Sequence, residues 1–190
     1  MKYLEPTNLC ESNDPAIIDL AKEIVNDKIG EDAAKALFYW VRDNVTWDIE
    51  PIVGAKAALE RNPRKAICID KSNIMVAFCR AVGIPARYVV ITGRLKVKRP
   101  ELDVDMLHVA AEVLVNDKWI LADPGYGEET KSIIEVSQFG EPIWIEDKLK
   151  EINRMEELPA PLFPDQMNEG LKKHPVAEIY KKLLKEIRSK

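Results

Sequence analysis

Residues 66–92, with the sequence AICIDKSNIMVAFCRAVGIPARYVVIT, contain the clearest change of pattern in the chain. In the first part, apolar residues recur at spacings of three and four, which predicts a helix with Cys68 at or just before its start. Gly83 and Pro85 supply a helix stop. The residues that follow are aromatic and β-branched, so residues 88–92 are predicted to form a strand. A helix that leads into a sheet indicates an α+β domain.

A second strand is predicted over residues 106–115. Side chains alternate between the two faces of a strand, and one face here is uniformly apolar. That face is the expected core face and carries Leu107, Val109, Ala111, Val113 and Val115. His108 belongs to the other face, so it is expected to point away from the densest part of the core.

A third strand is predicted over residues 118–123, after a two-residue turn at residues 116–117. Such a turn pairs Val115 with Lys118. The same register places Asp123 on the face that carries His108, one diagonal step away, where the two side chains can meet. A three-residue loop without a bulge would place Asp123 on the opposite face.

The remaining elements are predicted from caps and periodicity. Asp14 followed by Pro15 indicates a helix start, and Gly30 is expected to end that helix. Further helices are expected over residues 32–44 and 55–61. Towards the C-terminus the sequence predicts short strands at 132–139 and 143–145, a helix at 146–155, a proline-marked linker (Pro159, Pro161 and Pro164) and an amphipathic helix along Val176, Ile179, Leu183, Leu184 and Ile187. This pattern suggests a main domain over residues 1–156 and an appendage over residues 157–190.

The composition excludes several classes of protein. A chain of 190 residues fits one domain of ordinary size. The net charge, 28 − 32 = −4, argues against a nucleic-acid-binding surface, which needs a basic stripe. The three cysteines form no CxxC pair, and the N-terminus lacks the apolar stretch of a secretion signal, so a cytoplasmic location is expected. No run of apolar residues is long enough to span a bilayer, so no membrane association is expected.

Three separated residues form a candidate catalytic constellation. Cys68 lies at a helix start, His108 on a strand and Asp123 on the next strand. A helix N-terminus and an adjacent imidazolium both favour a thiolate, the nucleophilic form of cysteine. In this arrangement His108 would shuttle the proton, and Asp123 would orient the imidazole. The backbone N–H of Cys68 is a candidate oxyanion donor, and the indoles of Trp47 and Trp40 are candidates for the second donor.

The motifs around these residues resemble the transglutaminase-like core of the papain-like cysteine enzyme superfamily. The resemblance rests on residues 66–71, on the helix end and turn at 78–87, on His108 with Glu112, and on Trp119 with Asp123-Pro124. Together with the upstream stretch 40–48 it covers residues 32–127, about half of the chain. It implies Cys68 as the nucleophile, His108 as the base and Asp123 as the orienting carboxylate, on a helix packed against an antiparallel sheet.

The sequence leaves the reaction open. The leading hypothesis is a thiol enzyme that forms an acyl-enzyme at Cys68 from an amide or isopeptide bond of a protein or peptide substrate, as a cysteine protease, an amidase or a transglutaminase-type acyltransferase. The alternative is a non-catalytic binding or scaffold module with the same fold. Glu112 and Trp119 are candidates for supporting positions around His108, although a sheet-edge charge for Glu112 and packing for Trp119 are the commoner explanations. No metal or other cofactor is expected, because a structural zinc site usually has four ligands in close pairs.

Overall fold

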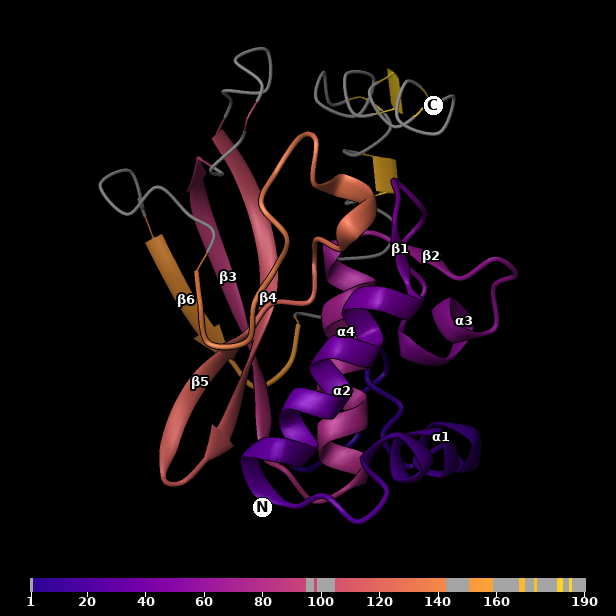
Figure 1. The fold of residues 1–190 in the computed structure, drawn as a ribbon, viewed down its shortest axis with the longest axis vertical. Helices are drawn as coiled ribbons and strands as arrows, with labels where there is room; N and C mark the ends of the chain where they lie inside the picture. Colours follow the sequence, from indigo (N-terminus) through magenta and orange to yellow (C-terminus); the bar gives the residue numbers. More distant parts are fainter. Residues whose placement is uncertain are drawn as a thin grey trace.

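The computed structural model forms two layers, with helices packed on one side of a four-stranded sheet (Figure 1). It describes residues 2–94, 98, 105–142, 151–158, 168, 169, 173, 181, 182 and 185. The predicted α+β class, with a helix packed against an antiparallel sheet, is confirmed.

Four helices form the first layer: α1 (Pro15–Val25), α2 (Gly30–Asn44), α3 (Ala55–Leu59) and α4 (Cys68–Ala81). The predicted cap of α1 is present, since the Asp14 carboxylate accepts the backbone N–H of Ala16 at 3.0 Å. The prediction that Gly30 ends this helix is wrong. Asn26, with a φ of 49°, caps α1 instead, and Gly30 is the first residue of α2.

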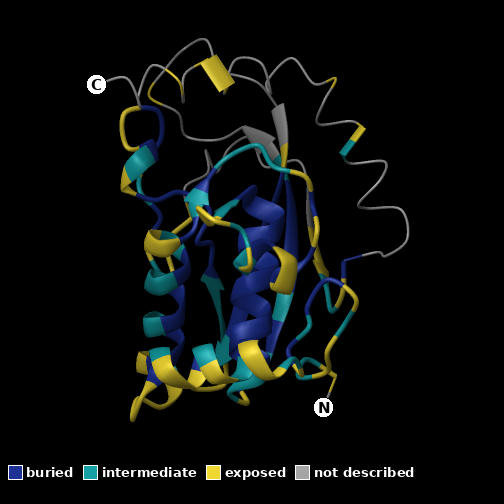
Figure 2. Cartoon of the chain, turned by 90° about the vertical axis from the view of Figure 1, so that its right-hand side faces the viewer, coloured by how far each residue is buried: buried dark blue, intermediate teal, exposed yellow. Residues whose placement is uncertain are grey.

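Helix α4 is the centre of the molecule. Every residue from Cys68 to Arg80 is buried, because α1, α2 and α3 pack around the helix on one side and the sheet covers the other (Figure 2). Its polar first turns are tied to their surroundings, and the Ser72 hydroxyl donates to the backbone oxygen of Val109 in the sheet at 2.9 Å. The position of the start of α4 relative to the sheet is therefore fixed by packing and by hydrogen bonds.

The sheet has the strand order β5-β4-β3-β6, with all neighbours antiparallel. The strands are β3 (Ala86–Arg94), β4 (Asp105–Val115), β5 (Lys118–Ala122) and β6 (Glu151–Met155). The predicted hairpin is confirmed, because Val115 pairs with Lys118 across a turn in which Asn116 and Asp117 have φ values of 51° and 60°. These left-handed values are those of a type I′ turn, whose twist matches that of the strands it joins.

A second, two-stranded sheet lies beside the start of α4. Strand β1 (Thr46–Trp47) pairs in parallel with β2 (Lys65–Ala66), so Trp47 lies next to Ala66, two residues before Cys68. The short 3₁₀ helix η2 (Glu128–Thr130) contacts β1 from the segment that follows β5.

The C-terminal predictions have mixed outcomes. Residues 151–155 form a strand, not the end of a helix, because they pair with the free edge of β3. Residues 132–139 form no strand, and only Ile134 takes part in a bridge. The predicted strand at 143–145, the three linker prolines and the apolar positions of the C-terminal helix lie outside the described residues. Among the residues that the structure describes, no helix is long and apolar enough to cross a membrane.

Candidate active site

Cys68 is the first residue of α4. The preceding Ile67 has extended backbone angles and provides no side-chain cap for the helix. The N–H groups of a first helical turn have no acceptors within the helix, and the helix dipole favours negative charge at this end. With 8% of its surface exposed, Cys68 lies at the edge of the core.

His108 and Asp123 form a buried pair across the β4–β5 hairpin. Nε2 of His108 lies 2.9 Å from Oδ2 of Asp123. The strand pairing follows the register predicted from the two-residue turn up to the pair Ala111–Ala122. Strand β5 ends there, and Asp123 begins the next loop. The other carboxylate oxygen, Oδ1, accepts the backbone N–H of Gly125 at 3.0 Å, so the loop orients the carboxylate toward the imidazole.

His108 is more deeply buried than the sequence suggested. As predicted, Val109, Ala111, Val113 and Val115 form part of the main core, and His108 belongs to the other face of β4. Its exposure is nevertheless zero. The residues of the segment that follows β5 cover this face, which strand periodicity alone does not predict. Leu107, placed on the core face by the sequence, is 41% exposed near the start of β4.

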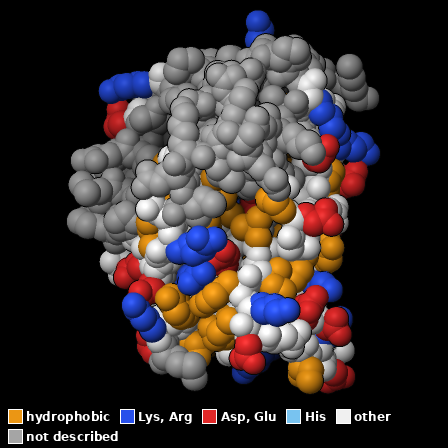
Figure 3. Space-filling model, turned by 90° about the vertical axis from the view of Figure 1, so that its left-hand side faces the viewer, with side chains coloured by type: hydrophobic (Ala, Val, Ile, Leu, Met, Phe, Trp, Pro, Cys, Tyr) orange, Lys and Arg blue, Asp and Glu red, His pale blue; other side chains and the backbone are white. Residues whose placement is uncertain are grey.

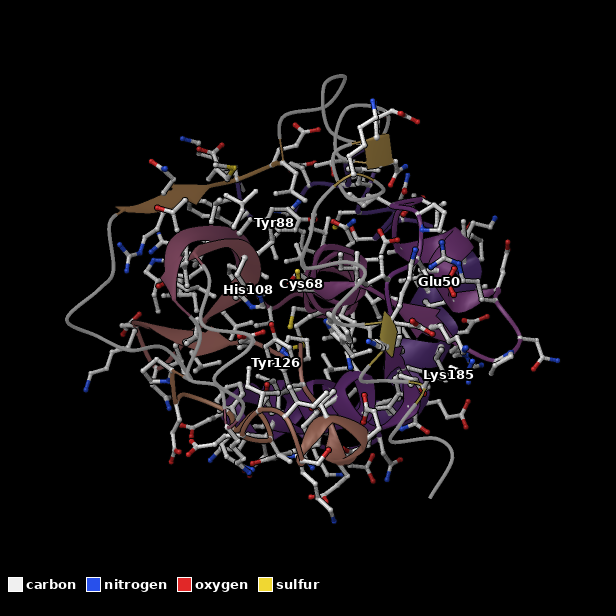
Figure 4. The ribbon with its side chains drawn as sticks, turned by 90° about the horizontal axis from the view of Figure 1, so that it is seen from above. Glu50, Cys68, Tyr88, His108, Tyr126 and Lys185 are labelled. Carbon is white, nitrogen blue, oxygen red and sulfur yellow. The ribbon has the colours of Figure 1, made fainter. Side chains whose placement is uncertain are left out.

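The Cys68 thiol lies beside the imidazole ring, within reach of a side-chain hydrogen bond to it (Figure 4). Burial by itself lowers the pKa of His108, but the Asp123 carboxylate and the Cys68 sulfur outweigh that effect and raise the pKa to about 10. Because Nε2 faces Asp123, Nδ1 is the nitrogen left for the thiol. The structure therefore brings Cys68, His108 and Asp123 together, with His108 in the middle.

The two indole candidates for an oxyanion donor lie in different places. Trp47 is 3% exposed, and its ring lies 6.1 Å from that of Tyr126, which in turn stacks on His108. Trp40 packs edge-on against Phe78, ten residues beyond Cys68. At 1.5 Å per residue this is about 15 Å along the helix axis. The structure brings Trp47 to the site and leaves Trp40 at the other end of α4.

The sequence also matches a known family. The model of the Transglutaminase-like superfamily matches residues 18–124, more than half of the chain. The chain belongs to the transglutaminase-like superfamily. The matched region begins before residue 32 and takes in most of α1, so this helix is part of the shared domain.

Comparison with solved structures finds a protein of the same fold. A candidate cysteine protease from Cytophaga hutchinsonii shares 22% sequence identity over 71% of this chain and 45% of its own, with a TM-score of 0.53, and this likeness shows a common fold. The chain thus spans less than half of that protein. A candidate protease from Parabacteroides distasonis is a weaker match, with 12% identity over 60% of this chain and 24% of its own and a TM-score of 0.46. A protein described as a TGase shares 23% identity over 57% of this chain and 29% of its own, with a TM-score of 0.35. No curated protein matches the chain.

Glu112 and Trp119 lie in a separate cluster of this transglutaminase-like domain. The Glu112 carboxylate accepts hydrogen bonds from Arg87 at 2.8 Å and from Arg154 at 3.1 Å. The Arg87 guanidinium stacks over the Trp119 ring at 3.9 Å. Figure 3 shows this side of the molecule, where basic and acidic side chains lie among hydrophobic ones. These contacts tie β3, β4, β5 and β6 together, and neither residue has a described contact with His108.

Two buried charged residues near the site were missed by the sequence analysis. Asp70 accepts the backbone N–H groups of Val53 and Gly54, and burial raises its pKa to about 6. Lys71 is fully buried and donates to the backbone oxygen of Val45 at 2.6 Å, and burial lowers its pKa to about 8. The sequence feature that could have revealed these two residues is the polar run that follows Cys68, in a helix otherwise rich in apolar residues.

The other two cysteines lie in the core. Burial raises the pKa of Cys10 to about 11 and raises that of Cys79 even further. Neither is exposed at all, so Cys68 is the most accessible of the three thiols. Among the described residues, no group of three or more His, Cys, Asp or Glu side chains could hold a metal ion.

Proposed function

We propose that this transglutaminase-like chain is a thiol enzyme that attacks an amide or isopeptide bond of a protein or peptide through an acyl-enzyme at Cys68. The observation that carries the proposal is the buried His108–Asp123 pair, with an Nε2–Oδ2 distance of 2.9 Å, beside a cysteine at a helix N-terminus. A thiol, an imidazole and a carboxylate in this order are the groups that nucleophilic acyl transfer requires.

The resting state would be an ion pair of Cys68 thiolate and His108 imidazolium, which fits the raised pKa of His108. The Cys68 sulfur attacks the carbonyl carbon, and the π electrons of the carbonyl move onto its oxygen. Collapse of this intermediate breaks the C–N bond while His108 gives its proton to the leaving amine. Asp123 keeps the ring oriented and stabilises the imidazolium in each half of the reaction.

The developing oxyanion needs donors placed before the reaction starts. The backbone N–H of Cys68 is one candidate, since it belongs to the first turn of α4. The buried indole Nε1–H of Trp47 is the second, because β1 lies beside the segment that leads into Cys68. Trp40 is not part of this proposal, because it packs at the far end of α4.

The acyl-enzyme can be resolved by water or by an amine. Hydrolysis is the simpler reaction, because water is always present and an amine acceptor needs a binding site of its own. In hydrolysis His108 takes a proton from water, the hydroxide oxygen bonds to the acyl carbon, and the thiolate leaves. The proposal is therefore a cysteine hydrolase, with transfer to an amine as the other outcome of the same intermediate.

An activated peptide ester tests the acyl-enzyme directly. Intact-mass measurement of the wild-type protein should show one added acyl group, and digestion should locate it on Cys68. The Cys68→Ala variant should gain no acyl group, and His108→Gln should gain it much more slowly. Loss of the adduct in water alone, compared with loss in the presence of a primary amine, separates hydrolysis from transfer. A wild-type protein that never acquires the adduct contradicts the proposal.

The burial of the site favours a second candidate, a non-catalytic binding module. Cys68 is 8% exposed and His108 is fully buried, so the described residues leave little access to the sulfur. In a module of this kind the three residues would serve only as a packed polar cluster. A protein that is only such a module would show no acylation by any peptide ester, and substitution of Cys68 by Ala would leave its binding to a partner unchanged.

A further inference from the structure

We propose that Tyr126 is a positioning residue that fixes the plane of the His108 ring and favours its imidazolium form. This inference rests on the proposed function, because it assigns Tyr126 a role in the same site. Tyr126 was not among the residues that the sequence singled out. It lies in the loop three residues beyond Asp123, where no spacing rule predicts a contact with the imidazole.

The geometry of the contact is that of a flat stack. The Tyr126 and His108 rings are inclined by only 16°, and their centroids are 5.7 Å apart. Both residues are almost completely buried, with exposures of 1% and zero. Figure 4 shows them near Cys68 at the centre of the molecule, one from the loop after β5 and the other from β4.

A flat neighbour restrains the imidazole in a way that Asp123 cannot. The Nε2–Oδ2 hydrogen bond fixes one ring atom, and the ring can still tilt about an axis through that atom. Tilting would swing Nδ1 away from the Cys68 sulfur. A ring lying nearly parallel to the imidazole opposes the tilt, because rotation of the imidazole towards that ring brings atoms of the two rings together. Tyr126 thereby keeps Nδ1 directed at the thiol.

Tyr126 is itself held from two sides. Its backbone N–H donates to the Ser137 hydroxyl at 3.1 Å, and its carbonyl accepts the Ser137 N–H at 2.8 Å. The Trp47 ring lies 6.1 Å from the Tyr126 ring, at an inclination of 32°. The Trp47 backbone N–H in turn donates to the Glu129 carboxylate at 2.8 Å. The aromatic neighbour of Tyr126 is therefore anchored as well.

The aromatic face also acts on the charge of His108. A cation over an aromatic ring is attracted by the negative face of the ring, and more strongly where water is excluded. The charged groups that act on His108 are Asp123, just after β5, and Cys68 on α4, and both favour the imidazolium. Tyr126 adds a neutral surface that favours the same form without taking a proton.

Imidazole NMR tests this role without any substrate. The chain has two histidines, so ¹H–¹⁵N spectra of the rings are assigned with a single His174→Gln variant. The Tyr126→Leu variant removes the aromatic ring, and Tyr126→Phe keeps it. Tyr3→Leu is the matched control, because it removes a ring that packs on Trp119 at 5.0 Å, away from His108.

We expect the His108 titration midpoint of Tyr126→Leu to fall by about one pH unit, which corresponds to a roughly tenfold weaker preference for the imidazolium. The rate of Cys68 alkylation at pH 6 should also fall, because a tilted ring no longer directs Nδ1 at the thiol. Tyr126→Phe should restore both values, and Tyr3→Leu should change neither. An unchanged His108 midpoint in folded Tyr126→Leu would overturn the proposal.

A second measurement applies if Tyr126→Leu does not fold. In the wild-type protein, a ring stacked on His108 must shift the carbon-bound imidazole protons upfield, and ordinary shifts for these protons also refute the role. The outcomes separate the two proposals. If the His108 spectrum depends on Tyr126 but the protein never forms an acyl-enzyme, only the proposed function is refuted. If the protein is acylated but the His108 spectrum does not depend on Tyr126, only the positioning role is refuted.

Discussion

Gly125 provides the sharpest test of how the loop shapes the site. A methyl group added at this position would lie 2.8 Å from Oδ1 of Asp123 and 3.3 Å from Cε1 of His108. Its backbone is not in the left-handed region, so alanine fits the main chain there. The effect of Gly125→Ala is therefore confined to the space between the loop and the His108–Asp123 pair.

The size of the effect follows from these distances. Ordinary contacts of a methyl carbon begin near 3.4 Å, so the Asp123 carboxylate must retreat by about 3.4 − 2.8 = 0.6 Å. That shift stretches its contacts with the Gly125 N–H, now 3.0 Å, and with His108 Nε2, now 2.9 Å. A hydrogen bond to a charged group contributes about 1.5–3 kcal/mol, and loss of about half of that is close to a tenfold change in an equilibrium.

The assay is the rate of Cys68 alkylation by iodoacetamide at pH 6, read by mass spectrometry of the Cys68 peptide. We expect Gly125→Ala to react about tenfold more slowly than the wild type. Gly140→Ala is the matched control, because its φ of +82° makes alanine strained and its methyl would meet only Ile120, at 3.4 Å. It should lose stability but keep the wild-type rate. Equal rates for Gly125→Ala and the wild type would refute the reasoning.

Three further predictions concern the charged groups of the site. Asp123→Asn removes the charge that raises the pKa of His108, so the His108 titration seen by NMR should move down toward 6.5 and alkylation at pH 6 should slow. Burial lowers the pKa of Lys71 from 10.5 to about 8, so the unfolded chain binds the extra proton between these values. Between pH 8 and 10.5 the free energy of unfolding of the wild type should therefore rise with pH. The rise should be about 3 kcal/mol larger than in Lys71→Met, as measured by urea unfolding. Asp70 has the opposite sign, because burial raises its pKa from 3.8 to about 6 and the native state keeps the proton longer. The contribution of Asp70 to stability should fall as the pH rises from 4 to 6, and Asp70→Asn should lack that fall. For either residue, equal slopes of unfolding free energy against pH in the variant and the wild type would contradict the prediction.

Local signals predicted the parts of the fold that depend on neighbours in sequence. Helix α4 follows from apolar spacing and the glycine and proline that end it, and the β4–β5 hairpin follows from its two-residue turn. Because strand register is arithmetic once the turn is known, the sequence could also place Asp123 on the His108 face. The approach of a helix start to these strands was suggested by the resemblance and not by any local pattern.

The sequence could not predict the contacts that loops and sheet edges make. Residues 151–155 carry no strong helix breaker, and only the open edge of β3 explains why they form a strand. The strand pattern placed His108 away from the densest part of the core, and the segment from Gly125 to Tyr126 buries it. The stack on Tyr126 is a tertiary contact of a loop, so periodicity has no signal for it.

The most direct test of the account is the reactivity of Cys68 itself. Free cysteine is only about 0.3% thiolate at pH 6, because its pKa is near 8.5. If Cys68 and His108 form an ion pair, Cys68 should react with iodoacetamide at pH 6 at least about tenfold faster than free cysteine, and His108→Gln should abolish this advantage. A folded wild-type protein whose Cys68 reacts no faster than free cysteine, or equally fast without His108, would contradict the central claim.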